Sequence, residues 1–409
     1  MTTRGSSGSI ISSQRPPFVL IVSITLTGIM ANTLITPAIP DIRDAFNVGT
    51  SATGLLLAAA TAPGIFLAPV LGLLADRFGR REVVVPCLVL FGLAGGLSSF
   101  APSFAVLLAL RLAQGIGSAG LINLAVTIIG DHWQGAERTR YIGLNAAALT
   151  ASIFVLPPIG GVLAGIGGWR LTFAPMWIAL VTATLMWRRL PRSARVAVTL
   201  RTQLSEARPY VGTARVLGAM VMAFVLFTMI FGLVLTVLPL YLADEFGVGA
   251  AGRGLMLAVP AVASTAAALN VGRIRHRVGA SVTLAAAFFF FVVAFAVMAA
   301  VPALPAIVVA LLLYGAGEGL SIPTLQDTVV SAAPMRNRGS LVALFVGVSR
   351  AGQTTGPVVG GVGLDAVGAR VTFAVAAALV LPIVAAQGWW RRSSRGRGRR
   401  GVVAVSEAG

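Results

Sequence analysis

The chain has 409 residues, of which 57% are hydrophobic and only 11% are charged, and its mean hydropathy is +0.90. Soluble globular domains carry about 25% charged residues, so this composition excludes a soluble fold and predicts a protein embedded in a lipid bilayer. The net charge of +18 comes from arginine alone, because the sequence contains no lysine. The arginines are spread over short connectors along the whole chain, so we expect no nucleic-acid partner.

Runs of about 17–25 apolar residues are long enough to cross a bilayer as helices. After a polar N-terminal tail (1–16), twelve such runs follow one another, at 17–40, 51–74, 84–100, 104–130, 140–163, 169–188, 215–240, 250–271, 279–301, 304–328, 340–363 and 370–389. A polar linker (189–214) divides them into two sets of six, and a basic tail (390–409) follows the last. The sequence therefore predicts an all-α integral membrane fold of two six-helix bundles, over residues 17–188 and 215–389.

The arginines indicate which side of the membrane each connector occupies. If the N-terminus is inside, 25 arginines fall on the inner side and four on the outer side, namely Arg43, Arg170, Arg253 and Arg370. Cytoplasmic connectors carry such an excess of basic residues. We therefore expect a multi-pass protein of the cell inner membrane, with both termini, the linker and the tail in the cytoplasm.

The two halves of the chain are related by an internal repeat. A shift of 200 residues, without a gap, places Gly72, Arg77 and Gly79 on Gly272, Arg277 and Gly279, and Gly115 and Gly117 on Gly315 and Gly317. The same shift places Pro157, Gly160 and Gly161 on Pro357, Gly360 and Gly361. Parallel six-helix repeats of this kind form one known transporter architecture, in which the substrate site lies between the halves at the membrane midplane.

Three motifs in the first half resemble those of the major facilitator superfamily, and the resemblance extends over nearly the whole chain. GLLADRFGRR (72–81) resembles the signature loop of that family between helices 2 and 3, and RLAQGIGSAG (111–120) resembles its helix 4 motif. LPPIGG (156–161) resembles the helix 5 motif of the drug:proton antiporter branch, and GQTTGPVVGG (352–361) is its copy in the second half. The resemblance implies a twelve-helix secondary transporter of the multidrug efflux type, which exchanges its substrate for protons by alternating access.

The chain departs from the antiporter pattern at a few positions. Ser152 and Leu156 stand where the helix 5 motif has glycine, and Asn32 stands where many drug exporters carry an acid in helix 1. Uptake or export of a specific metabolite, such as a sugar, an amino acid or a siderophore-like product, is therefore an alternative to drug efflux. A membrane receptor that keeps the fold without transporting is a second alternative.

Glu318 lies near the middle of the run 304–328 and has no charged neighbour in sequence. An ionised side chain at that depth costs about 2.5–3.5 kcal/mol. We expect Glu318 either to carry the coupled proton or to act as counter-ion for a cationic substrate. A structural acid, satisfied by a neighbouring helix where glycines allow close packing, is the alternative.

Arg111 and Arg350 are the two arginines inside the predicted spans. A buried guanidinium needs a partner, so we expect Arg111 to bind a substrate anion or to adjust the proton affinity of a carboxylate. The alternative is that Arg111 extends its head group to the membrane surface. The polar residues Asn32, Gln114 and Gln353 are expected either to line the cavity or to form hydrogen bonds between helices.

Two further sets of residues carry expectations about movement. The resemblance implies that the signature loop gates the cytoplasmic side, with Asp76 pairing to an arginine or a helix N-terminus of the other half. The gating residues are Gly72, Asp76, Arg77, Gly79, Arg80 and Arg81. Prolines and glycines in the fifth and eleventh runs are expected to allow helix bending, namely Pro157, Gly160, Gly161, Gly356 and Pro357. The phenylalanine run 288–291 is predicted to face lipid.

Several kinds of chemistry find no support in the sequence. It contains no phosphate-binding loop, and neither His132 nor His276 has a companion at metal-ligand spacing. Cys87 is the single cysteine, which excludes an internal disulfide. We therefore expect neither an enzyme nor a cofactor or metal site. The expected partners are a small-molecule substrate, protons and membrane lipids, and the chain is expected to act as a monomer.

Overall fold

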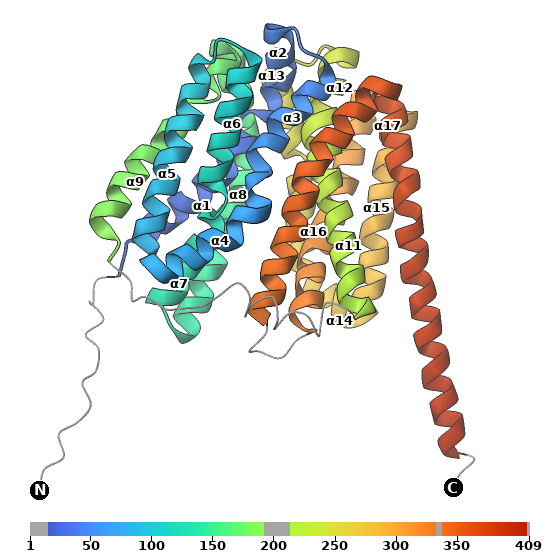
Figure 1. Ribbon diagram of the computed structural model, residues 1–409. Helices are drawn as coiled ribbons and strands as arrows, with labels where there is room; N and C mark the ends of the chain where they lie inside the picture. The colour runs from blue at the N-terminus through green and yellow to red at the C-terminus, as the bar shows by residue number, and fades with distance from the viewer. Residues whose placement is uncertain (1–14, 192–212, 333–337, 407–409) are drawn as a thin grey trace, which may run out of the picture.

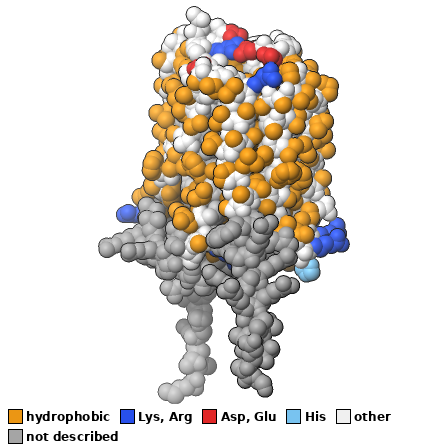
Figure 2. Space-filling model, turned by 90° about the vertical axis from the view of Figure 1, so that its right-hand side faces the viewer, with side chains coloured by type: hydrophobic (Ala, Val, Ile, Leu, Met, Phe, Trp, Pro, Cys, Tyr) orange, Lys and Arg blue, Asp and Glu red, His pale blue; other side chains and the backbone are white. Residues whose placement is uncertain are grey.

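The structure, a computed structural model, describes residues 15–191, 213–332 and 338–406 (Figure 1). Regular structure in these ranges is helical throughout, and ten segments are long and apolar enough to cross a membrane. Figure 2 shows a broad hydrophobic surface, with the charged side chains at the two ends of the molecule. The predicted all-α membrane fold is confirmed.

In the first half, consecutive short helices combine into membrane-length segments. The bounds are α1 Phe18–Thr33, η1 Thr36–Ala38, α2 Ile39–Phe46, α3 Thr50–Thr61, α4 Pro63–Phe78, α5 Arg80–Leu97, η2 Ser98–Phe100, α6 Phe104–Ser118, α7 Leu121–His132, α8 Gly135–Leu171, η3 Ala174–Trp177 and α9 Ile178–Arg189. The helices α1 and α2 form one such segment, and so do α3 with α4 and α6 with α7.

The second half repeats this arrangement. Its elements are α11 Ala214–Met229, the π-helical η4 Ile230–Val237, α12 Leu238–Phe246, α13 Ala250–Ala258, α14 Pro260–Val278, α15 Ala280–Ala300, α16 Leu304–Val330 and α17 Arg338–Ser406. The long α17 consists of two arms that meet at a break at Gly368 (Figure 1). Its second arm continues to Ser406, so the predicted tail 390–409 begins as an extension of the last helix, while most of the predicted linker 189–214 lies outside the described residues.

Left-handed turns fall at equivalent places in the two halves. Positive φ angles occur at Asn47 and Gly247 (50° and 61°), at Gly79 and Gly279 (114° and 84°), and at Gly168 and Gly368 (71° and 78°). Each pair is 200 residues apart, as the repeat predicts. Glycine adopts these angles without the steric cost that other residues incur. The breaks at Gly168 and Gly368 separate the predicted runs 140–163 from 169–188 and 340–363 from 370–389.

We name the two ends of the bundle by these turns. The distal end carries the turns at Asn47, Gly168, Gly247 and Gly368, and the terminal end carries the start of α1 and the turns at Gly79 and Gly279. Buried apolar residues form two clusters, one for each half of the chain, except that Leu240 of α12 packs into the first.

One prediction about the helix surface is wrong. Phe288 and Phe291 are fully buried, and both rings belong to an aromatic cluster with Phe295 and Tyr314. Phe289, by contrast, is 52% exposed. Residues three apart on a helix share a face, so consecutive phenylalanines cannot all face lipid. Half of the run 288–291 therefore stabilises the core of the second half.

Candidate functional site

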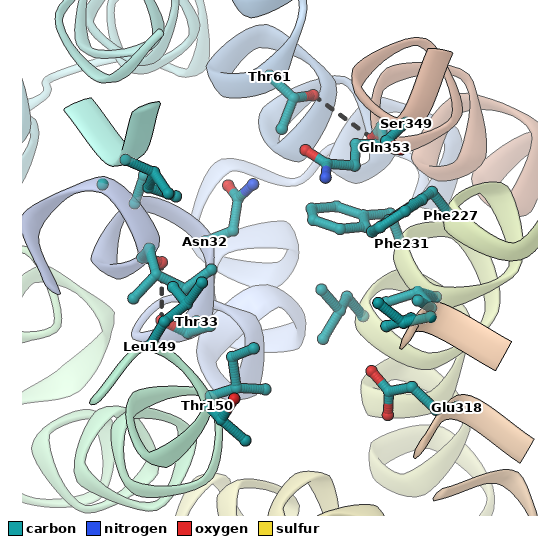
Figure 3. Close-up of a pocket in the computed structure, with 18 of the residues that line it drawn as sticks. Asn32, Thr33, Thr61, Leu149, Thr150, Phe227, Phe231, Glu318, Ser349 and Gln353 are labelled. Carbon is teal, nitrogen blue, oxygen red and sulfur yellow. Dashed lines mark hydrogen bonds between the residues drawn. The ribbon is translucent and has the colours of Figure 1, made fainter. Parts of the chain in front are cut away.

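A cavity of about 420 Å³ lies between the two halves of the bundle (Figure 3). Its volume lies within the range of small-molecule sites, about 300–1,000 Å³. Both halves contribute lining residues. Among the described lining residues, the first half provides only uncharged side chains, six of them polar, and the second half provides most of the aromatic rings and both charged residues. The residues most relevant here are Asn32, Thr33, Thr61, Ser118 and Thr150 from the first half and Phe227, Phe231, Tyr314, Glu318, Arg350 and Gln353 from the second.

Interrupted helices position several of these side chains. Asn32 and Thr33 lie at the end of α1, and Thr61 lies at the junction of α3 and α4. Phe227 and Phe231 stand on either side of the transition from α11 into the π-helical η4. Thr236 donates a hydrogen bond to the carbonyl of Phe231, five residues earlier (2.8 Å). Such π-helical turns occur frequently at functional sites because they re-aim side chains.

Glu318 extends from α16 into the cavity (Figure 3). The glycines beside it serve packing, because a Cβ atom at Gly315 would lie 1.9 Å from the carbonyl oxygen of Pro260, and one at Gly319 would lie 2.2 Å from that of Ser264. Within the described residues, the Glu318 carboxylate forms no hydrogen bond or ion pair. The close packing that the alternative reading required is present, but it does not satisfy the carboxylate.

Arg111 is fully buried and does not line the cavity. Its guanidinium donates hydrogen bonds to the carbonyl oxygens of Ala31 (2.6 Å) and Leu56 (3.2 Å). It also donates to the side-chain oxygens of Gln114 (2.6 Å) and Asn32. The side chain therefore joins α6 to α1 and α3 and does not extend to the membrane surface. With four acceptors engaged inside the first half, it is not placed to meet a substrate.

The other polar candidates divide between these two environments. Gln114 is fully buried beside Arg111, and its Nε2 atom lies 2.7 Å from the sulfur of Met176. Asn32 lines the cavity while its oxygen accepts from Arg111. Gln353 lines the cavity from the second half, and its backbone oxygen accepts a weak hydrogen bond from Thr61 (3.4 Å).

Arg350 lines the cavity from the first arm of α17. Its side chain crosses to the first half and packs on Gly64 of α4, where a Cβ atom would lie 3.3 Å from its Cδ. In the part of the chain that the structure describes, its guanidinium forms no hydrogen bond or ion pair. The two intramembrane arginines thus differ completely, since one is enclosed by acceptors and the other faces the cavity without one.

The signature loop is stabilised from within its own half. Asp76 pairs with Arg80, whose Nε atom also binds Asp131 of α7 (2.8 Å). Arg81 stacks on Trp187 of α9, with 4.0 Å between the guanidinium carbon and the ring centre. Arg77 lies 5.4 Å from the ring centre of its neighbour Phe78. Among the described residues no hydrogen bond joins this loop to the second half, so the expected partner of Asp76 across the interface is not found in this conformation.

The distal end, in contrast, holds the two halves together by charge. Arg43 binds both carboxylate oxygens of Asp244 (2.7 and 2.8 Å). Arg253 binds Asp41 (2.7 Å) and the carbonyl oxygen of Pro37 (2.7 Å). The sequence indicated Arg43 and Arg253 only as outer arginines and gave no sign of these pairs, because their members are more than 200 residues apart.

Close backbone packing reinforces the same interface. A Cβ atom at Gly54 would lie 2.1 Å from the carbonyl oxygen of Pro357, and one at Gly254 would lie 2.5 Å from that of Pro157. These two contacts are related by the 200-residue repeat. Gly161 meets the Ala250 carbonyl in the same way (2.5 Å). Of the residues predicted to bend helices, Pro157, Gly161 and Pro357 thus lie where helices of the two halves cross. Gly160 and Gly356 instead pack within their own halves, where a Cβ atom would lie 2.0 Å from the carbonyl oxygen of Leu34 and 2.4 Å from that of Thr228. At each of these places glycine permits close backbone contact.

A membrane-embedded bundle of two repeated halves, with a cavity between them and ion pairs across one end, has an architecture known from secondary transporters. The family model of the Major Facilitator Superfamily matches residues 21–350 and 220–402. The chain therefore belongs to this superfamily of membrane transporters, and the resemblance inferred from the motifs is confirmed.

Relatives with described functions include exporters. The chain is 24% identical to the bacillibactin exporter of Bacillus subtilis (strain 168) over 374 residues, which covers 83% of this chain and 88% of the relative. It is 26% identical to the class B tetracycline resistance protein of Escherichia coli over 346 residues, covering 82% and 85% of the two chains. Among solved structures, an occupied, inward-facing bacterial homolog of the human lysosomal transporter Spinster has a TM-score of 0.76 and 18% identity, covering 92% of this chain and 96% of that one.

Proposed function

We propose that this transporter exports small, partly hydrophobic molecules in exchange for protons, by alternating access between its two halves, over residues 17–188 and 215–389. The observation that carries the proposal is Glu318, a carboxylate that faces the cavity between the halves without a partner among the described residues. Such intramembrane acids are characteristic of proton pathways and substrate sites. The efflux relatives support export as the direction.

In this proposal the terminal end faces the cytoplasm, as the excess of arginines on that side predicts. The ion pairs and glycine contacts at the distal end then close the external side. A substrate enters from the cytoplasm and occupies the cavity next to Glu318. Opening of the distal end, accompanied by closure at the terminal end, exposes the substrate to the outside.

Glu318 couples the two fluxes because a proton and a cationic or hydrogen-bond-donating substrate group compete for the same carboxylate. A proton arriving from outside displaces the substrate, and the protonated carboxyl group returns to the cytoplasmic side. The carboxyl group then releases its proton to the cytoplasm, and the resulting carboxylate binds the next substrate. Arg111 takes no direct part in this cycle and maintains the shape of the first half.

The relatives indicate where a substrate search starts. Tetracycline resistance and bacillibactin export are the named activities of two proteins that match most of this chain. The cavity of this chain is lined by aromatic rings and a few polar groups, which suits partly hydrophobic compounds. Tetracycline is therefore the first compound to test, followed by bacillibactin.

The test is uptake into inverted membrane vesicles whose interior is made acidic. We expect the wild-type protein to accumulate tetracycline or another compound of the panel, and an uncoupler to abolish the accumulation. Glu318→Gln removes the ionisable group but keeps the shape, so it should abolish accumulation. Ser118→Ala is the matched control, because Ser118 occupies the equivalent position in the first half and also lines the cavity.

Three outcomes contradict the proposal. Normal accumulation by Glu318→Gln would exclude this residue as the coupling group. Accumulation only in right-side-out vesicles would indicate uptake of a metabolite, which is the alternative that Asn32 and the altered helix 5 motif leave open. Binding without counterflow exchange would indicate a receptor.

A further inference from the structure

The cavity contains two opposite charges, and both come from the second half. Glu318 projects from α16 and Arg350 from the first arm of α17. In the described part of the chain, neither side chain pairs with the other or with any third residue. Both are half-buried inside the membrane-spanning region. Charged groups in such surroundings are costly and normally find a partner, so the cavity is built to receive one from outside.

Among the residues that the structure describes, the first-half wall of the cavity supplies no charge. The 200-residue repeat places Ser118 at the position of Glu318 and Thr150 at the position of Arg350, and both of these neutral residues line the cavity. Arg111, the intramembrane arginine of the first half, is withdrawn into the helix packing with four acceptors. Of the described residues that line the cavity, Glu318 and Arg350 are therefore the two that can recognise a charged ligand.

Aromatic rings accompany the two charges. Gln353 lies three residues after Arg350 on α17, so the two share a helix face. Figure 3 shows the rings of Phe227 and Phe231 between Gln353 and Glu318 on the second-half wall. A ligand that reaches from Glu318 towards α17 would thus lay an apolar body over these rings.

We propose that the preferred substrates are zwitterionic amphipaths, with a cationic group at Glu318, an anionic group at Arg350 and an aromatic or other apolar body between them. This inference rests on the proposed function. A simple cation can pair with Glu318 but leaves Arg350 unpaired and is repelled by it. A simple anion can pair with Arg350 but leaves Glu318 unpaired and is repelled by it. A zwitterion satisfies both groups, and its cationic end still competes with the proton for Glu318, as exchange requires.

The experiment measures equilibrium binding to the full-length protein in lipid nanodiscs at neutral pH. The probes share one aromatic body and carry an amine and a carboxylate at opposite ends, an amine alone, or a carboxylate alone. The zwitterion is made with several spacer lengths, so that no single spacing decides the result. We expect the best zwitterion to bind about 10-fold to 100-fold more tightly than either singly charged probe, as a charge-assisted hydrogen bond allows.

Variants assign the preference to Arg350. Arg350→Gln should reduce zwitterion binding to the level of the amine probe without weakening the amine itself. Arg350→Lys keeps the charge and should retain most of the preference. Arg370→Gln removes an arginine that does not line the cavity and should have no effect on the preference. Size-exclusion profiles confirm that each variant is folded.

The proposal is overturned if no probe binds the wild-type protein, if the amine binds as tightly as every zwitterion, or if Arg350→Gln keeps the full preference. These results are separate from those of the vesicle experiment, because equilibrium binding needs no pH gradient and the proposed coupling group is Glu318, not Arg350. Loss of the zwitterion preference together with intact Glu318-dependent accumulation would reject this inference alone. The preference without Glu318-dependent accumulation would reject only the coupling.

Discussion

The two halves of this transporter share a backbone plan but place their intramembrane charges in opposite ways. In the first half, Arg111 is enclosed by Ala31, Leu56, Gln114 and Asn32 and does not reach the cavity. In the second half, Glu318 and Arg350 face the cavity without partners among the described residues. The repeat therefore sets the architecture, while the chemistry is asymmetric. One half provides a neutral wall held together by a buried arginine, and the other half provides the charged groups.

The largest effect is expected on stability, when the hydrogen bonds of the buried Arg111 are removed. Arg111→Leu should destabilise the first half severely, because each buried acceptor left without a donor costs about 1–3 kcal/mol. Arg350→Gln should leave stability near that of the wild type, since no described residue loses a partner. The measurement is the fraction of protein that remains monodisperse after heating in detergent. Equal stability of Arg111→Leu and the wild type would mean that the enclosed network is not structural.

The next largest effect concerns the sealed distal end. Gly54→Ala places a methyl group within 2.1 Å of the Pro357 carbonyl oxygen, so the two halves should separate there. Spin labels at the exposed positions Ala45 and Glu245 should then report a second, longer distance. Gly347→Ala is the control, because a Cβ atom there has no neighbour within 4 Å. An unchanged distance distribution in Gly54→Ala would show that this contact does not hold the distal end closed.

Removing single ion pairs at the distal end should have a graded, smaller effect on the same distance. Arg253→Gln should shift the population more than Arg43→Gln, because the Arg253 side chain is 5% exposed and that of Arg43 is 18% exposed. Exposed ion pairs contribute about 0.2–1 kcal/mol, so Arg43→Gln should change the ratio of states by less than about fivefold. The opposite order of the two variants would contradict the proposal that these ion pairs hold the distal end closed.

The smallest effect on the distance between Ala45 and Glu245 is expected from a change at the terminal end. Asp76→Asn breaks the pair with Arg80, but both residues belong to the first half. Distances between Ala45 and Glu245 should therefore remain those of the wild type, while transport slows if the loop locks another state. A shift as large as that of Arg253→Gln would mean that the loop already holds the second half in this conformation.

The sequence predicted the architecture well because its determinants are local or periodic. Apolar runs and the 200-residue repeat defined the helices and the turns at Gly79, Gly279, Gly168 and Gly368. Glu318 could be identified because it is an acid near the middle of an apolar run, without a charged neighbour in sequence. In each of these cases the property can be read from the residue type and its position along the chain.

The fate of each arginine could not be predicted, because it depends on how helices rotate against one another. Arg111 and Arg350 look alike in sequence, yet one faces other helices and the other faces the cavity. The partners Asp41 and Arg253 are separated by 212 residues, and no local pattern connects them. Likewise, the sequence shows that the run 288–291 is hydrophobic, but it does not show which of these phenylalanines pack into the cluster with Phe295 and Tyr314.

Proton release on substrate binding tests most directly the claim that Glu318 is shared by substrate and proton. The purified protein is mixed in weakly buffered solution with a compound that it accumulates in the vesicle experiment, and the pH change is recorded. The wild-type protein should release protons as the compound binds, and Ser118→Ala should do the same. Glu318→Gln should release no protons, whether or not it still binds the compound. Binding to the wild type without proton release, or equal release by Glu318→Gln, would contradict the account.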